Sequence, residues 1–101
     1  MLLLSPLLFL LFLISKTNVI ADGDIPNQYR DINEPSEYID RIKITCLESG
    51  EVFNATVNND GTWSTNIHII FNGNQSRFSI EGYNVNNPNK IIARQRVVIV
   101  K

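Results

Sequence analysis

Apolar side chains recur at every second position through most of the chain after residue 40, a period typical of β-strands with one buried face. The stretches that follow this period cover residues 41–46, 52–57, 62–71, 77–81 and 91–100. Asn, Asp and Gly separate them, most clearly at residues 58–61, and these residue types tolerate the backbone conformations of tight turns. Gly82 interrupts the pattern and indicates a bulge or the end of a strand. The sequence therefore predicts five or six strands joined by turns.

Amino-acid usage in residues 22–101 disfavours helices. This part of the chain contains 12 Ile and one Leu, and β-branched residues favour strands. Parallel strands need long crossover connections, for which the pattern leaves no segment. We therefore expect an all-β fold, namely a small antiparallel sandwich or barrel. The last stretch ends on four apolar residues, 97–100, which indicate an exposed edge capable of self-association.

The amino terminus has the features of a secretory signal peptide. Residues 2–14 form an apolar run interrupted only by Ser5 and Pro6, which matches the apolar part of a signal and is short of the roughly 20 residues that a membrane span needs. Val19 and Ala21 place suitable side chains at the −3 and −1 positions of a cleavage site. We expect residues 1–21 to be removed and the mature protein to be secreted, with no membrane span. The alternative is an uncleaved anchor over residues 2–21.

The remaining 80 residues are enough for one domain. Residues 22–37 contain two prolines and five acidic residues without strand or helix period, and are expected to be an extended leader before a sandwich over residues 38–101. The formal net charge of the whole chain is −1 and no block of like charge occurs, which disfavours nucleic acid as a partner. One His and one Cys are too few for a His/Cys metal site, so no cofactor is expected.

None of the residue types capable of catalysis occurs in a recognisable catalytic motif in this sequence. Cys46 shares a strand face with Ile42 and Ile44, which favours a buried thiol over an intermolecular disulfide, although an unpaired cysteine in an exported chain leaves both open. His68 lies between two isoleucines on a strand and is interpreted as a solvated residue. The serines lack the Gly-x-Ser-x-Gly motif of a nucleophile elbow. An enzyme is therefore not expected.

Two further groups of residues follow from the strand pattern. Trp63 aligns with Ile67 and Ile69 on one strand face and is expected in the core. The other expected core and structural residues are Cys46, Phe71, Phe78 and Tyr83. Asn54 and Asn74 begin Asn-x-Ser/Thr sequons, one on an outward strand face and one in a turn, and are candidate N-glycosylation sites.

Residues 50–70 resemble the immunoglobulin-like modules that occur in tandem on bacterial surface and adhesion proteins. The resemblance rests on an apolar-x-Ala-x-Val strand at residues 53–57 and an Asn-rich turn, followed by Asp60-Gly61-Thr62-Trp63-Ser64. Residues 42–46 also resemble the B strand of animal immunoglobulin domains, and residues 76–85 resemble their late strands. Val85 occupies the position of the second cysteine of those domains, so their inter-sheet disulfide has no counterpart. The resemblance implies an immunoglobulin-like sandwich used for adhesion or recognition.

Taken together, these features predict a secreted, non-catalytic interaction module that binds an extracellular protein or glycan. The alternative is a carbohydrate-binding module in which an exposed Trp63 stacks on a sugar ring. A small enzyme or protease inhibitor has no motif in this sequence, and an inhibitor of this size more often carries several disulfides.

Overall fold

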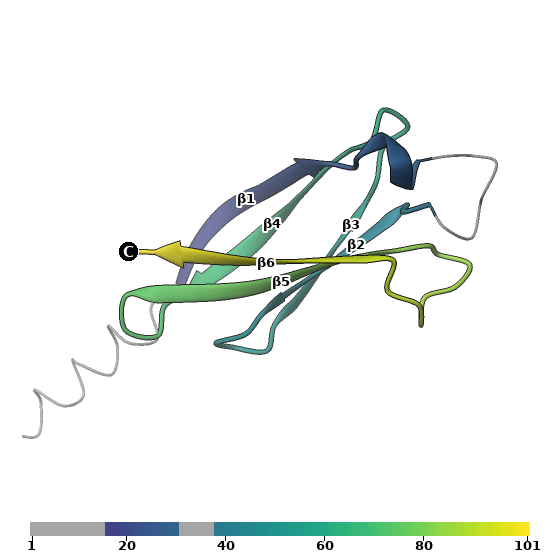
Figure 1. Ribbon diagram of the computed structural model, residues 1–101. Helices are drawn as coiled ribbons and strands as arrows, with labels where there is room; N and C mark the ends of the chain where they lie inside the picture. Colours follow the sequence, from purple (N-terminus) through teal and green to yellow (C-terminus); the bar gives the residue numbers. More distant parts are fainter. Residues whose placement is uncertain (1–15, 31–37) are drawn as a thin grey trace, which may run out of the picture.

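Six strands arranged in two antiparallel sheets make up almost all of the regular structure (Figure 1). The computed structural model describes residues 16–30 and 38–101. Its elements are β1 (Lys16–Asp24), the 3-10 helix η1 (Asn27–Tyr29), β2 (Arg41–Cys46), β3 (Val52–Thr56), β4 (Thr62–Ile70), β5 (Gln75–Tyr83) and β6 (Ala93–Val100). The two sheets pack together, which confirms the prediction of an all-β sandwich.

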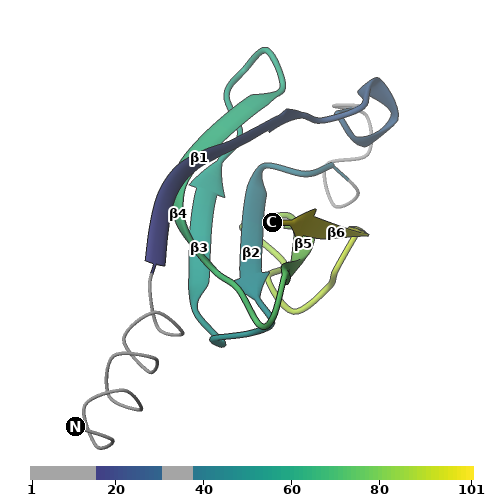
Figure 2. The ribbon, with the colours of Figure 1, turned by 90° about the vertical axis from the view of Figure 1, so that its left-hand side faces the viewer.

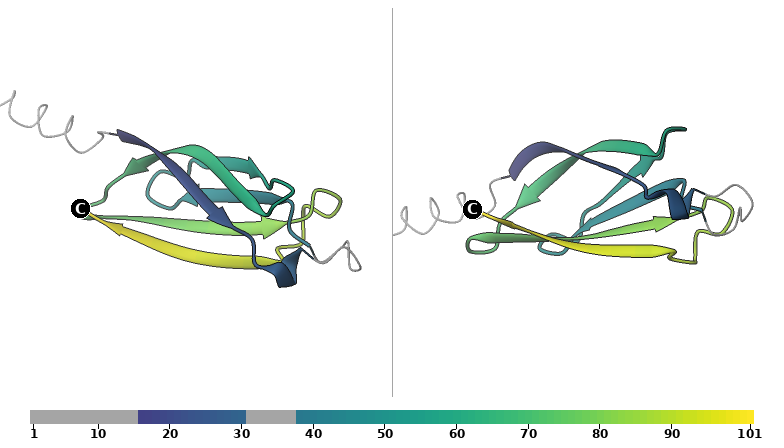
Figure 3. Two further views of the ribbon diagram at one scale, coloured as in Figure 1. Left: turned by 90° about the horizontal axis from the view of Figure 1, so that it is seen from above. Right: turned by 45° about the horizontal axis from the view of Figure 1, so that its top comes forward.

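One sheet has two strands and the other has four. β1 pairs with β4 over nine residues, and the larger sheet has the order β3-β2-β5-β6. β4 lies next to β3 at one side of the molecule, and β2, β5 and β6 follow in turn (Figure 2). β1 and β6 are therefore the two strands at the ends of this series. The chain that leaves β1 passes close to the start of β6 (Figure 3).

The core is built from alternate side chains of the facing sheets. Its buried apolar residues are Ile25, Ile39, Ile42, Ile44, Cys46, Ala55, Trp63, Ile67, Ile69 and Phe78. The strand period places these side chains inward, because residues two apart point to the same side of a sheet. Phe71 is half-buried against this cluster, and Tyr83 is half-buried at the end of β5. Almost every strand contributes to this single core.

One local expectation is wrong. β5 continues through Gly82 to Tyr83 without a break, so Gly82 ends no strand. A Cβ atom at Gly82 would lie 2.6 Å from Cδ1 of Ile39, so the glycine is needed for close packing of a neighbouring segment. In addition, β2 and β5 are neighbours in one sheet, with Cys46 opposite Phe78.

Residues 16–30 contribute to the sandwich. Lys16–Asp24 forms β1, so the last six residues of the expected signal peptide and the first three of the expected leader lie in one strand. Val19 and Ala21 pack against the core, and Ile25 is buried within it. The apolar run 2–14 and residues 31–37 lie outside the described residues. Within residues 16–30 and 38–101, no helix is long and apolar enough to cross a membrane.

The turn between β2 and β3 is attached to β5 by one carboxylate. The backbone N–H of Arg77 donates to Glu48 Oε2 at 2.7 Å, and Arg77 Nε donates to Oε1 at 3.0 Å. The backbone hydrogen bond from Arg77 is the main reason that the pKa of Glu48 lies below its ordinary value of 4.5, and the Arg77 side chain lowers it further. Glu48 is therefore ionised at neutral pH and joins the β2–β3 turn to β5.

We expect Glu48→Gln to lower the urea midpoint of unfolding at pH 7, and we expect this difference to shrink progressively as the pH falls below about 4.5. A carboxyl group whose pKa is lowered by folding stabilises the folded state above its unfolded pKa of about 4.5, and this contribution is lost as the pH falls through the folded pKa. Urea titrations of both proteins at several pH values measure the difference. A gap between the two proteins that does not narrow in acid would contradict this assignment.

We also expect a chain that begins at Asp22 to be less stable than one that begins at Lys16, by about 2 kcal/mol, because it loses six pairs with β4 and the packing of Val19 and Ala21. Chemical denaturation of the two proteins measures this. In the longer chain, Val19→Ser should reproduce part of the loss, whereas Ile20→Ser, at an exposed neighbouring position, should not. Equal stability of the two chains would show that residues 16–21 add nothing to the fold.

Candidate functional site

A cleft of about 570 Å³ lies between the end of β1 and the start of β6, where the two sheets are not covered by further strands. Its lining includes the apolar side chains of Ile25, Ile39, Ile42, Trp63, Ile80 and Val97. Both sheets and the segment between β1 and η1 contribute to it. Ligand sites in proteins are typically concave and lined mainly by apolar groups with a few polar ones at fixed positions. This cleft is the candidate functional site.

The contact between Trp63 and Gly23 shapes the floor of the cleft. Gly23 lies opposite Trp63 in the register of β1 and β4. A Cβ atom at Gly23 would lie 2.9 Å from three atoms of the indole, so the ring covers the glycine backbone. The indole is only 7% exposed, and it forms part of the cleft wall. Little of the ring is therefore open to solvent for stacking on a sugar.

The rim of the cleft carries opposite charges on its two sides. Asp22 and Asp24 are exposed on β1, and the structure gives neither carboxylate an ion pair within the described chain. On the β6 side, Arg94 Nη2 donates to Glu81 Oε2 at 2.7 Å, so its charge is largely balanced. The net charge at the mouth is therefore negative. A ligand with an apolar part and a neighbouring cation is complementary to this arrangement.

The β3–β4 turn holds the chain that forms one end of the cleft. The backbone N–H of Ile25 donates to the Gly61 carbonyl at 2.8 Å, and Arg30 Nη2 donates to the Asn59 carbonyl at 3.1 Å. The hydroxyl and N–H of Thr62 both donate to Asp60 Oδ1, and these bonds keep the pKa of Asp60 below its ordinary value. The bond to Gly61 fixes Ile25 in the cleft wall. Within the turn, Asp60 and Thr62 are hydrogen-bonded to each other.

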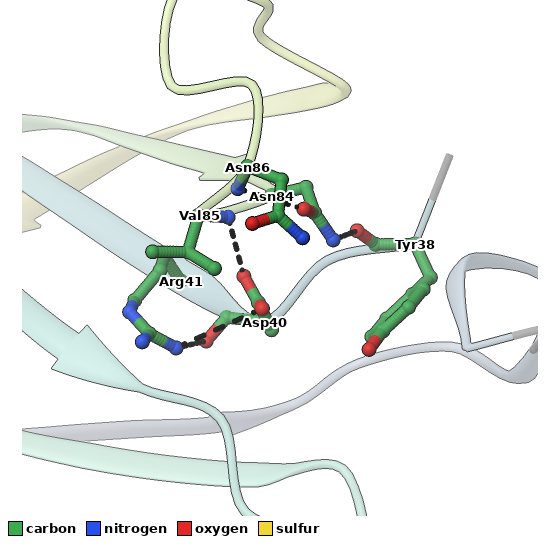
Figure 4. A network of polar contacts seen from close by, with 6 residues as sticks. All are labelled: Tyr38, Asp40, Arg41, Asn84, Val85 and Asn86. Carbon is green, nitrogen blue, oxygen red and sulfur yellow. Dashed lines mark hydrogen bonds and ion pairs between the residues drawn. The ribbon is translucent and has the colours of Figure 1, made fainter. Parts of the chain in front are cut away.

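A polar network fixes the opposite end (Figure 4). Asn84, which is buried, donates from Nδ2 to the Tyr38 carbonyl at 3.1 Å. Asp40 Oδ1 accepts the backbone N–H of Val85 at 2.9 Å. Ile39 lies between these two contacts in the sequence and packs on Gly82, so the network sets the position of one apolar wall. The strand pattern assigned no role to Asn84. Several other asparagines follow it within residues 85–89, so nothing in the sequence distinguished it as a buried residue.

The residues singled out from the sequence lie at separate places. Asn54 is exposed on β3 and Asn74 is exposed in the turn before β5, whereas the sequon hydroxyl of Ser76 is buried with no hydrogen-bond partner. Cys46 is completely buried at the end of β2, and Phe78 is buried opposite it. None of these residues lines the cleft.

His68 lies on β4 with 39% of its side chain exposed, and its Nδ1 lies 3.2 Å from Glu51 Oε2. The rings of His68 and Phe53 pack edge to face, with their centroids 5.6 Å apart. The pair joins β4 to the start of β3 and lies away from the cleft lining. Residues 16–30 and 38–101 contain no group of three or more side chains suited to holding a metal ion.

We expect the Cys46 thiol to react with iodoacetamide at least about a hundredfold more slowly in the native protein than in urea, because a buried thiol reacts only after the fold opens. Intact mass spectrometry during the reaction measures the rate. The same spectra without reductant should give the mass of a single chain. Rapid labelling of the native protein, or a disulfide-linked pair, would show that Cys46 is accessible.

Comparisons with protein-family models, with curated proteins and with solved structures found no match.

Proposed function

We propose that this chain is an exported, non-catalytic interaction module that binds an extended segment of a protein partner in the cleft between β1 and β6. The observation that carries the proposal is the cleft itself, which combines apolar walls from both sheets with exposed carboxylates at its rim. An apolar side chain of the partner fills the space beside Trp63 and Val97. A neighbouring Lys or Arg of the partner lies near Asp22 and Asp24.

The sequence supports export. The apolar run 2–14 and the small residues near Ala21 have the pattern of a secretory signal, and both sequon asparagines are exposed. Glycans at Asn54 and Asn74 would lie outside the cleft lining, so they would leave the proposed site accessible.

The order of the strands supports the resemblance to immunoglobulin-like modules. Those sandwiches place strands B and E side by side in one sheet and C′, C, F and G in the other. β1 and β4 correspond to B and E, and β3-β2-β5-β6 corresponds to C′-C-F-G in the same chain order. In this alignment residues 42–46 belong to strand C, one strand later than their sequence suggested. Modules with this architecture commonly act in recognition, which agrees with the proposed role.

The chemistry of the cleft favours a protein segment over a glycan. A sugar presents hydroxyl groups on most of its edges, and each needs a polar partner when it is buried. Apolar groups, among them Trp63 and Ile42, supply most of the lining surface, which also includes polar side chains from β1 and β6. An apolar side chain releases water from such walls without leaving unpaired polar groups.

Selection from a phage-displayed library of random peptides tests the proposal. We expect the selected peptides to combine an apolar anchor with an adjacent Lys or Arg, because the cleft pairs apolar walls with free carboxylates. Ala93→Phe, which fills the cleft from β6, should weaken binding of these peptides at least about tenfold, since it removes the space for the anchor. Asp22→Asn with Asp24→Asn should reduce the preference for the basic residue while leaving the apolar anchor.

The matched control is Val52→Phe on β3, which enlarges an exposed apolar side chain outside the cleft lining and should leave binding unchanged. Circular dichroism establishes that each variant retains the fold. Peptides that bind Ala93→Phe as well as the original protein would overturn the cleft as the site. Selection of glycans from an array, with no peptide enriched, would overturn the choice of a protein ligand.

A further inference from the structure

The outer half of β6 is an unprotected sheet edge. β6 pairs only with β5 among the described strands, and its last four residues are apolar. Val98 is 54% exposed and Val100 is 69% exposed. Natural sheets usually protect such edges with charged side chains, proline, bulges or a covering segment, because a bare edge pairs readily with another strand. The first half of β6 carries Arg94 and Arg96, whereas the second half has no charged residue before Lys101.

The hydrogen-bond pattern shows which backbone groups face this edge. The backbone N–H of Lys101 donates to the Asn74 carbonyl at 2.7 Å, in register with the pairing of Val100 and Gln75. Alternate residues of an antiparallel strand turn their N–H and C=O groups to opposite sides. Val98 and Val100 therefore direct these groups away from β5, to the open side. The charge of Lys101 does not guard the edge, because its Nζ lies over the Phe71 ring at 5.5 Å from the centroid.

We propose that β6 pairs with β6 of a second copy of this chain in an antiparallel, two-fold symmetric dimer centred on Val98. In this register Val98 lies opposite Val98 of the second copy, and Arg96 lies opposite its Val100. A second copy presents the same exposed apolar half-strand, so the two edges are complementary to each other. The charge pattern selects the direction, since parallel pairing would place Arg94 and Arg96 beside the same cations of the second copy. The two large sheets then form one continuous sheet across the dimer.

This inference is independent of the proposed peptide ligand. Val98 and Val100 do not line the cleft, whose β6 residues are Ala93, Arg94, Gln95 and Val97. A substitution at Val98 therefore tests the dimer without filling the cleft, and Ala93→Phe tests the cleft without changing the apolar edge. Failure of either proposal can be recognised without reference to the other.

The first experiment measures the mass of the protein secreted from cells that express the full chain, by sedimentation equilibrium over a range of concentrations. We expect a reversible dimer. Val98→Lys should raise its dissociation constant at least about tenfold, because the substitution places two like charges opposite each other at the dimer axis. The matched control is Val52→Lys on β3, which is 46% exposed at the other end of the large sheet and should dimerise like the original protein.

The second experiment tests the register. The two Val98 positions would form a hydrogen-bonded pair with Cα atoms about 5.5 Å apart, which is within the range that a disulfide spans. Val98→Cys should therefore form a disulfide-linked dimer under mild oxidation much faster than Val52→Cys, while the buried Cys46 stays reduced. The proposal is overturned if the protein is monomeric at every concentration, if Val98→Lys dimerises as well as Val52→Lys, or if the two cysteine variants crosslink at the same rate.

Discussion

A two-stranded sheet cannot cover a four-stranded one, and this mismatch determines where the molecule is open. Neighbouring strands lie about 4.8 Å apart, so the small sheet spans about 5 Å between strand axes and the large sheet about 14 Å. β4 lies beside β3 and covers that side of the large sheet. β5 and β6 are left with little above them, and the cleft forms where β1 ends. The candidate site is thus a consequence of strand number, and its walls are core residues that no further strand covers.

The same mismatch makes the amino-terminal strand important. β1 is half of the small sheet, and its inward residues Val19 and Ala21 lie opposite Ile67 and Thr65 of β4 and pack against the core. The cleavage position expected from the sequence, after Ala21, would leave only Asp22–Asp24 of β1 in place. A chain cut there would retain the Gly23–Trp63 contact and the cleft floor, but most of β4 would become an open edge. Processing and folding therefore depend on the same few residues.

The strands from β2 onward were predictable, because alternation of apolar and polar residues is a local signal. β1 was not, since the exposed Ile20 breaks the alternation of Val19 and Ala21, and the apolar run before them resembles a signal peptide. The cleft was also beyond prediction: it depends on which strands face each other across the core. Gly82 illustrates the difficulty. A glycine is needed there because the Ile39 side chain packs against it, and Ile39 lies about 40 residues earlier in the sequence.

The two halves of β6 differ in character. Its first half contributes Ala93, Gln95 and Val97 to the cleft, and Arg94 there is held by Glu81 on the outer face. Its second half has no charged side chain and directs free backbone groups outward. A strand that served only to close the sheet would be expected to carry charge along its whole outer edge. The confinement of charge to the half nearest the cleft is therefore consistent with one end that binds a ligand and another that binds a second copy of the chain.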